Sequence, residues 1–377
     1  MASLRRSWHG VQELRVRLDD GDEVPALSYP LLTGEVAVGD EVLLNVSAYE
    51  RRLGTGGFAL VVASPSRVRA GEQASATASV VASPGHLVKA RYSPAQAMVL
   101  GVDEQESAHH ALLRDADSLD GTPVVVADLH SSLPAVVAGA RWAAAEVGRP
   151  APVVAYVMTD GGALPAWFSR TAAALREAGW IAATVTTGQS FGGDLEAVSV
   201  HSGLLAAHLV VEADLVVVTQ GPGNLGTGTR WGFSGVGAGE AVNATATLGG
   251  RPVAALRVSA ADERPRHRGL SHHSTTAYGR VALAAADVVV PRLTSALPVF
   301  DTRLEQLHEE VRRDAAALAQ APAGHRIVEV TVTPGLDESL RSAPVRLSTM
   351  GRTLDQDPAA FYASAAAGAH AARLLAG

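Results

Sequence analysis

The ten residues "PVVVADLHSS" (123–132) set the pattern from which the fold class is predicted. They begin with a continuous apolar run in which no polar residue alternates with the valines. A short run of this kind is typical of a strand whose two faces are both buried, as in a parallel sheet covered by helices. Polar residues follow at once, with Asp128, His130 and Ser131, and an apolar helical segment comes next. Strand, polar loop and helix in this order predict one unit of an α/β fold.

The same unit recurs along the chain toward the C-terminus. Strands are predicted at 123–129, 152–159, 181–187, 215–220, 252–259 and 287–293. Helices are predicted between them at 133–147, 165–178, 194–210, 236–248 and 274–286. Right-handed crossovers then give a doubly wound, Rossmann-like and mostly parallel sheet. A charged helix at 304–320, a strand at 325–333 and an Ala-rich helix starting at Asp357-Pro358 are expected to complete or cover it, with Asp357 as the helix cap.

The first hundred residues have a different pattern of apolar and turn-forming residues. Short strands separated by glycine-containing turns are predicted at 13–18, 24–29, 41–46, 58–64 and 86–92. Five short strands of this kind favour a small β-barrel. The Ser-, Ala-, Gly- and Pro-rich segment 65–84 is interpreted as a mobile surface loop. We therefore expect a barrel domain over residues 1–100 and an α/β domain over residues 101–377.

Composition narrows the classes of function. Hydrophobic residues form 47% of the 377 residues and charged residues 18%, which indicates a globular chain. The net charge of -7 and the absence of Lys/Arg runs argue against a nucleic-acid partner. The sequence has no cysteine, which excludes thiolate nucleophiles and Cys-ligated metals. Neither a signal peptide nor an apolar window of about 18 residues is found, so a cytoplasmic protein without membrane contact is expected.

Polar, glycine-rich loops follow the strands, whereas the loops that lead into the strands are short and ordinary. "TDGGALP" (159–165), "TGQSFGGDLE" (187–196) and "QGPGNLGTGTRWGFSG" (220–235) all come after a strand. The loops at the other end read "REAGW", "VEAD", "LGGR" and "AAAD". In open parallel sheets, ligands bind beyond the carboxyl ends of the strands. The sequence therefore predicts a small-molecule cleft at that end.

Carboxylates and imidazoles in these loops are the candidates for chemistry. Two residues separated by one position on an extended strand end point the same way, so Asp128 and His130 suit metal ligation or acid–base catalysis. Asp160 and Asp194 at strand ends could ligate a metal, act as a base or cap a helix. The catalytic candidates are Asp128, His130, Asp160, Asp194 and His272. The candidate ligands of a divalent metal ion are Asp128, His130, Asp160, His272 and His273, and one of the two adjacent histidines is expected to face the cleft.

An anion site is predicted beside them. Backbone N–H groups of the loop "GPGNLGTGT" (221–229), with a helix behind it, suit phosphate, and arginines suit bidentate anion recognition. The candidates are Gly221, Gly223, Gly226, Thr227, Gly228, Thr229, Arg266 and Arg268. The alternative is a tight turn that needs positive φ at its four glycines. The first α/β strand lacks the dinucleotide fingerprint, so NAD is not expected.

Two functions remain open. The first is an enzyme that acts on a small anionic, perhaps phosphorylated, substrate by metal-assisted hydrolysis or group transfer. The second is a non-catalytic nucleotide- or metabolite-binding protein whose barrel docks a partner. No GxSxG elbow marks a hydrolase triad. A homo-oligomer could form through the barrel strands or the Ala-rich C-terminal helix.

Long motifs in the chain match a known family. "AYVMTDGGALPAWFSR", "TTGQSFGGDLEAVSVHSGLLAA", "GPGNLGTGTRWGFSG", "RHRGLSHHSTTA" and "STMGRTLDQDPAAFYASAAAG" are among them. The sequence resembles the bacterial domain-of-unknown-function family 3866 over nearly its whole length. It departs at Val46-Ser47, where the family often has Thr-Thr, and at Ser190, where Ala is usual. The resemblance implies that the motifs belong together, and it implies no particular activity.

Overall fold

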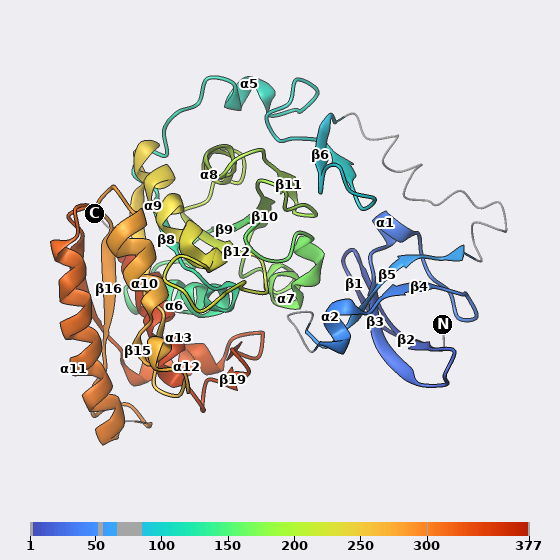
Figure 1. The fold of residues 1–377 in the computed structure, drawn as a ribbon. Coiled ribbons are helices and arrows are strands. Elements are labelled where there is room, and N and C mark those ends of the chain that lie inside the picture. Colours follow the sequence, from blue (N-terminus) through green and yellow to red (C-terminus); the bar gives the residue numbers. More distant parts are fainter. Residues whose placement is uncertain (1–2, 52–55, 66–84, 300, 376–377) are drawn as a thin grey trace.

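Eight parallel strands form the large sheet of this computed structural model, which describes residues 3–51, 56–65, 85–299 and 301–375 (Figure 1). The order across the sheet is β11-β10-β9-β12-β8-β13-β16-β17. The strands are β8 (Pro123–Val126), β9 (Val154–Thr159), β10 (Ala183–Thr186), β11 (Leu195–Glu196), β12 (Leu215–Gln220), β13 (Arg251–Ala255), β16 (Asp287–Arg292) and β17 (Arg326–Thr331). All of their pairings are parallel. The predicted parallel α/β sheet is therefore confirmed.

Helices flank both faces of this sheet. Along β8, Val125 packs with the helices α6 (Leu133–Glu146), α7 (Arg170–Glu177) and α13 (Pro358–Leu374). Val124 and Val126 face the opposite way, toward α8 (Val200–Leu209), α9 (Gly237–Thr247) and α11 (Thr302–Ala316). Because successive strand residues point to opposite faces, a continuous valine run is needed to fill both cores. A further helix, α12 (Pro334–Arg341), packs against α6 and α13.

The Ala-rich helix α13 lies buried against α6. A Cβ atom at Gly139 of α6 would overlap the carbonyl of Ala365, and one at Gly368 of α13 would overlap the carbonyl of Val136. Small residues therefore allow the two backbones to come into contact. The expectation that α13 offers a dimer surface is wrong, because residues 363–372 are buried within the chain. Asp357 precedes α13 as expected, but its side chain makes no cap hydrogen bond.

Two predicted helices differ from the observed elements. The helix predicted from residue 194 begins at Val200, where Ser199 and Ser202 form a capping box. Residues 195 and 196 instead add the edge strand β11 to the sheet. The helix predicted at 274–286 is replaced by the short α10 (His272–Thr276), followed by one π-helical turn, η5 (Ala277–Val281).

The N-terminal strands form a separate five-stranded sheet in the order β1-β2-β3-β5-β4. They are β1 (Ser3–Trp8), β2 (Val11–Arg17), β3 (Glu23–Ser28), β4 (Leu43–Asn45) and β5 (Ala59–Ala63), with short helices α1 (Pro30–Thr33) and α2 (Ser47–Glu50) between them. Strand β1 was not predicted, because "SLRRSW" is polar and mostly exposed. Since β1 and β4 are the edge strands, a small sheet is confirmed and its closure into a barrel stays a prediction.

The segment predicted as a fifth barrel strand at 86–92 belongs elsewhere. Its strand β6 (Leu87–Lys89) pairs with β7 (Ala97–Val99) in a hairpin of its own. The loop predicted at 65–84 lies, apart from Pro65, outside the described residues. In the parts of the chain that are described, no helix is long and apolar enough to span a membrane.

Aromatic side chains join the N-terminal sheet to the large sheet. The indole nitrogen of Trp8 donates a hydrogen bond of 2.7 Å to the carbonyl of Trp167. The Trp167 ring meets Tyr29 from the small sheet and Phe191 from the loop after β10. Arg170 adds an ion pair of 2.8 Å to Glu13 of β2. The small sheet is thereby held against loops at the carboxyl end of the large one.

Candidate functional site

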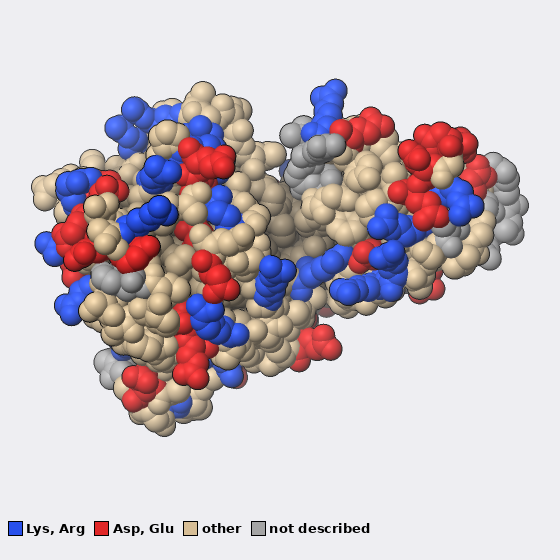
Figure 2. Space-filling view, turned by 90° about the horizontal axis from the view of Figure 1, so that it is seen from below, with Lys and Arg blue, Asp and Glu red and all other residues tan. Residues whose placement is uncertain are grey.

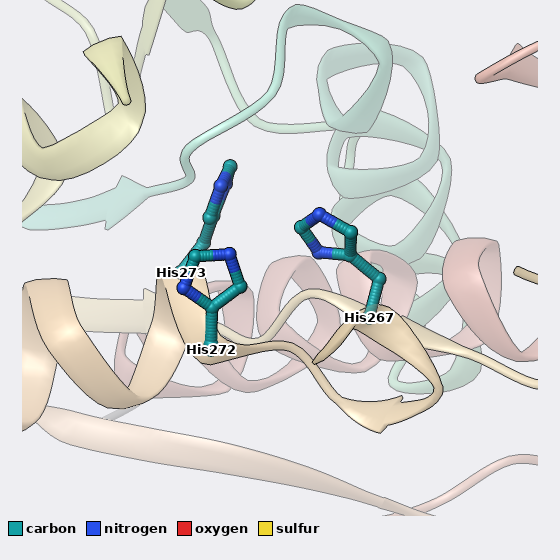
Figure 3. A group of neighbouring side chains, drawn as sticks. All are labelled: His267, His272 and His273. Atoms are coloured by element: carbon teal, nitrogen blue, oxygen red, sulfur yellow. The ribbon is translucent and has the colours of Figure 1, made fainter. Parts of the chain in front are cut away.

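Three histidine side chains gather at one point of the structure. His267, His272 and His273 each offer a ring nitrogen, and these three atoms lie within 4.8 Å of one another. Figure 3 shows the three rings projecting to the same side of their segment, with His267 turned toward the other two. The expectation that only one of the two adjacent histidines faces the cleft is wrong, because both join this group. We call His267, His272 and His273 the imidazole cluster.

A small hairpin explains how the cluster forms. After β13 the chain makes β14 (Val258–Ser259), which pairs antiparallel with β15 (Gly269–Leu270). The 3₁₀ turn η4 (Pro265–His267) lies between these two strands, so His267 returns over the start of α10. The ring centroids of His267 then lie 5.0 Å from His272 and 4.9 Å from His273. Ser271 caps α10 by accepting from the His273 amide, which sets the orientation of both neighbouring histidines.

The cluster lies at the carboxyl ends of the three adjacent strands β12, β8 and β13. Asp128 follows β8, Phe233 comes from the loop after β12, and Arg257 follows β13. Phe233 stacks on the His273 ring at a centroid distance of 3.8 Å and an interplanar angle of 11°. The chain after β8 leads to α6 on one face, and the chain after β12 leads to α9 on the other. This is the kind of switch point at which open α/β sheets bind ligands.

Asp128 is a buried carboxylate that holds His273. Its Oδ2 lies 3.0 Å from Nδ1 of His273 and 3.4 Å from Nη1 of Arg257. Burial by itself raises the pKa of Asp128, but the hydrogen bonds and charges of His273 and Arg257 outweigh it, so this pKa lies below its ordinary value. Nη1 of Arg257 also lies 2.9 Å from Nδ1 of His273, so this ring nitrogen contacts both the carboxylate and the guanidinium.

The pKa values of the other two histidines are lowered by their surroundings. Nδ1 of His267 lies 2.8 Å from the Ser271 hydroxyl, and burial with the nearby charge of Arg257 lowers its pKa to about 3. Burial and the neighbouring His273 lower the pKa of His272 to about 4. Nε2 of His272 is buried and has no hydrogen-bond partner among the described residues. Two nitrogens on one zinc ion lie roughly 3.4 Å apart, since each is about 2.1 Å from the metal. The ring nitrogens of the cluster, within 4.8 Å of one another, are near this separation.

A second polar atom beside Asp128 also lacks a partner. Nε2 of Gln220 donates to the Asp128 carbonyl at 2.7 Å, which fixes the orientation of the amide. Its Oε1 is buried and has no partner within the described part of the chain. The end of β12 therefore presents a buried acceptor without a partner among the described residues, close to Gly161 of the loop after β9, and such atoms often mark a site that takes a ligand or water.

His130 does not belong to this group, contrary to the sequence prediction. Strand β8 ends at Val126, and His130 begins the 3₁₀ turn η1 (His130–Ser132) that leads into α6, so the strand-based alignment with Asp128 fails. Nδ1 of His130 lies 2.9 Å from the Tyr156 hydroxyl and Nε2 lies 2.6 Å from the Ser169 hydroxyl. Both ring nitrogens are occupied within the fold, so His130 is unsuited to bind a metal.

Because the side chain of His130 is largely buried, we expect the stability of the folded chain to depend on pH. Burial lowers its pKa from 6.5 to about 4 in the folded chain. The unfolded chain therefore takes up a proton first as the pH falls, and the stability present above pH 6.5 is lost progressively toward pH 4. The loss from this group is about 3 kcal/mol. Denaturation of wild type and His130→Gln between pH 7 and 4 should show a shallower slope in the variant.

The exposed His201 provides the matched control for that measurement. A His201→Gln variant should keep the wild-type slope, because this exposed side chain makes no contact that the substitution would remove from the core of the sheet. Equal slopes for wild type and His130→Gln would contradict the assignment of the pH dependence to His130.

Asp160 and Asp194 also hold the fold together. The exposed Asp160 accepts from the Gln189 amide at 2.8 Å and thereby fixes the loop after β10. Asp194 accepts from the Thr184 amide at 2.8 Å, beside the amino-terminal half of β10, and from Arg176. Neither carboxylate contacts a member of the imidazole cluster among the interactions described. The structure therefore brings Asp128, His272 and His273 together from the predicted set and places His130, Asp160 and Asp194 elsewhere.

The glycine-rich loop is partly explained by turn geometry. Only Gly223 and Gly228 of its four glycines have positive φ, at 90° and 80°, so the turn alternative accounts for two positions. Gly221 donates to the Thr159 carbonyl at 3.1 Å. The loop also closes on itself, because Thr227 donates to the Gly232 carbonyl at 2.7 Å and Gly232 donates to the Thr229 hydroxyl at 3.1 Å.

The two arginines of the predicted anion site differ in position. Arg266 lies beside the loop, since a Cβ at Gly228 would be 3.8 Å from its Nη2. Its charge also acts on His272. Arg268 is exposed. Sequence reasoning missed Arg257, Phe233 and Gln220, and it missed His267 as a ligand although the residue lies in the same His-rich segment.

One family matches the chain. It is described as "Protein of unknown function (DUF3866)", and the match covers residues 25–368. Neither the curated proteins nor the solved structures contain a match to the chain.

Proposed function

Because the chain belongs to the DUF3866 family of proteins of unknown function, we propose a function from the imidazole cluster: a metal-dependent enzyme acting on a small anionic substrate. In this proposal His267, His272 and His273 hold one divalent transition-metal ion. The observation that carries it is the convergence of three histidine side chains, beside which Nε2 of His272 is buried without a partner among the described residues. Buried polar atoms are rarely left unsatisfied, so a ligand for this atom is expected.

The surroundings of the cluster support a metal. Metal-binding histidines commonly donate their other ring N–H to a carboxylate or another acceptor, which fixes the tautomer. Asp128 is in this position for His273, and the Ser271 hydroxyl is in this position for His267. The stacked ring of Phe233 excludes water from one side of His273. The buried negative charge of Asp128 also offsets the positive charge that an ion brings.

Three imidazoles suit a borderline-soft ion such as Zn²⁺ and leave a fourth position open. An ion bound in this way lowers the pKa of water and polarises a substrate oxygen. Asp160 and Asp194 are not required for this chemistry. Hydrolysis or transfer of a group to water is therefore the reaction class that the site supports best.

Positive charge next to the cluster supports an anionic substrate. Arg257 is nearly buried, with 8% of its side chain exposed, and it lies 3.4 Å from Asp128. The exposed Arg266 adds a second guanidinium beside His272 and the turn at Gly228. Guanidinium groups recognise phosphate and carboxylate oxygens in bidentate fashion. A phosphate ester held by Arg266 would place its central atom close to the imidazole cluster.

The proposal is tested by metal analysis and turnover. The purified full chain, incubated with Zn²⁺ and desalted, should retain about one ion per chain. It should then hydrolyse 4-nitrophenyl phosphate, and a chelator should stop the reaction. A chain that retains no ion would overturn the proposal. A chain that retains the ion and is stabilised by nucleotides, yet turns nothing over, would favour the non-catalytic binding protein instead.

A further inference from the structure

A cavity of about 670 Å³ lies between the N-terminal sheet and loops at the carboxyl end of the large sheet. None of the described residues that line it is charged. Its walls include Tyr29, Leu60 and Val62 on the side of the small sheet, and Leu164, Phe168 and Leu225 on the side of the loops. Figure 2 shows a hollow between the two parts of the molecule, with uncharged side chains inside it and Lys or Arg side chains along its lower border. We call this space the apolar cavity.

The apolar cavity ends beside the imidazole cluster. Gly223, Asn224 and Leu225 of the loop after β12 line it. Oδ1 of Asn224 accepts from the Ser234 hydroxyl at 2.8 Å, which turns the amide nitrogen toward His273. That nitrogen lies 3.4 Å from Nδ1 of His273. One side chain therefore separates the apolar cavity from the imidazole cluster.

We infer that the apolar cavity binds the apolar body of the substrate, an anionic amphiphile whose phosphate-like head reaches the imidazole cluster. This inference rests on the proposed function for the position of the head, whereas the binding of the body rests on the apolar cavity alone. The charges are arranged to match such a molecule, with guanidinium groups of Arg257 and Arg266 near the cluster and no charged side chain among the described residues of the walls.

The size and surface of the apolar cavity support one bound small molecule. Its volume lies within the range of about 300–1,000 Å³ that is usual for sites of this kind. Val62 and Leu225 line it with 52% and 70% of their surface exposed. A small inorganic ion would leave these apolar side chains in water. An alkyl or aryl chain would cover them, which is favourable in proportion to the area buried.

The experiment compares phosphate esters of increasing chain length. Binding of butyl, hexyl and octyl phosphate to the full chain is measured by calorimetry, below their micelle-forming concentrations, with inorganic phosphate as reference. Each buried methylene should tighten binding about fourfold. The series is run with Zn²⁺ and again with a chelator, so that the contributions of head and body are measured separately.

Two pairs of variants locate the bound chain. Val62→Asp and Leu225→Asp put a charge into the apolar cavity and should remove the dependence on chain length. Val38→Asp and Leu283→Asp change side chains that are also exposed, at 68% and 78%, but do not line it. These two controls should retain the wild-type dependence.

The outcomes separate this inference from the proposed function. One outcome is that the chain retains no Zn²⁺ but its affinity still rises with chain length in chelator. This result would support the apolar cavity as a binding site and contradict the proposed metal-dependent enzyme. A second outcome is that the chain retains Zn²⁺ but binds phosphate and octyl phosphate with equal affinity. This result would contradict the inference that the substrate is an amphiphile and would leave the proposed metal site unaffected. Equal effects of the cavity and control variants would also contradict that inference.

Discussion

Replacing His272 with alanine is expected to abolish stoichiometric Zn²⁺ binding and, with it, metal-dependent turnover. Nε2 of His272 is buried without a partner among the described residues, so under the proposed function its loss removes a metal ligand but no hydrogen bond of that atom. Loss of a group that only supports a ligand typically weakens metal affinity 10–100-fold. Loss of one of three ligands should weaken it by more than that. Metal content after desalting and competition with a chromophoric chelator measure the effect.

The matched control is again the exposed His201, which lies on α8. A His201→Ala variant should retain one ion per chain and wild-type turnover. The thermal stability of His272→Ala in chelator should equal or exceed that of the wild type, because an unsatisfied buried polar atom is removed. Unchanged metal content in His272→Ala would contradict the assignment of His272 as a ligand.

Sequence reasoning could predict the large sheet because the physical signal is local. A strand such as β12, with six buried residues in succession, must be covered on both faces. Its largely apolar sequence therefore predicts the strand and its burial. Strand β1 has no such apolar run. Its residues are mostly exposed, and its position depends on pairing with β2. Propensity and periodicity do not report a strand that is held by its neighbour alone.

The site was predicted in part for a related reason. Sequence order shows at which end of a parallel sheet a loop lies, and Asp128, His272 and His273 do lie at the carboxyl end. It does not show toward which face a side chain turns once the strand has ended. Asp128 turns toward His273, whereas His130, two residues later, turns toward Tyr156. The 3₁₀ turn that begins at His130 causes this difference in direction. No pattern in the sequence predicted that turn.

The position of His267 beside His272 and His273 was missed for a different reason. Its position depends on the β14–β15 hairpin, whose strands have two residues each. A network around Asp357 holds the start of this hairpin. Ser259 donates to the Asp357 carboxylate, and Arg352 lies 3.1 Å from it. The contact between Ser259 and Asp357 joins residues 98 positions apart, so local sequence did not predict it.

A second large effect is expected at a buried ion pair outside the candidate site. Lys89 of β6 is 1% exposed, and its Nζ donates to the carbonyls of Ser190 and Ala197 at 2.9 Å each. It lies 3.6 Å from the buried carboxylate of Glu196 in β11. Burial lowers the pKa of Lys89 and raises that of Glu196, while their mutual attraction opposes both shifts. The pair joins the β6–β7 hairpin to the edge of the large sheet.

Lys89→Met should lower the free energy of unfolding by about 3–5 kcal/mol, because it leaves a buried carboxylate and two buried carbonyls without their cation. The double variant Lys89→Met/Glu196→Leu should recover part of this loss, since no uncompensated charge remains. Arg17→Met is the matched control, because the Arg17–Glu23 pair is solvent-exposed at 3.1 Å and should contribute only about 0–1 kcal/mol. Denaturant unfolding of the four chains measures these differences. Equal losses in Lys89→Met and Arg17→Met would show that burial does not make the Lys89–Glu196 pair critical.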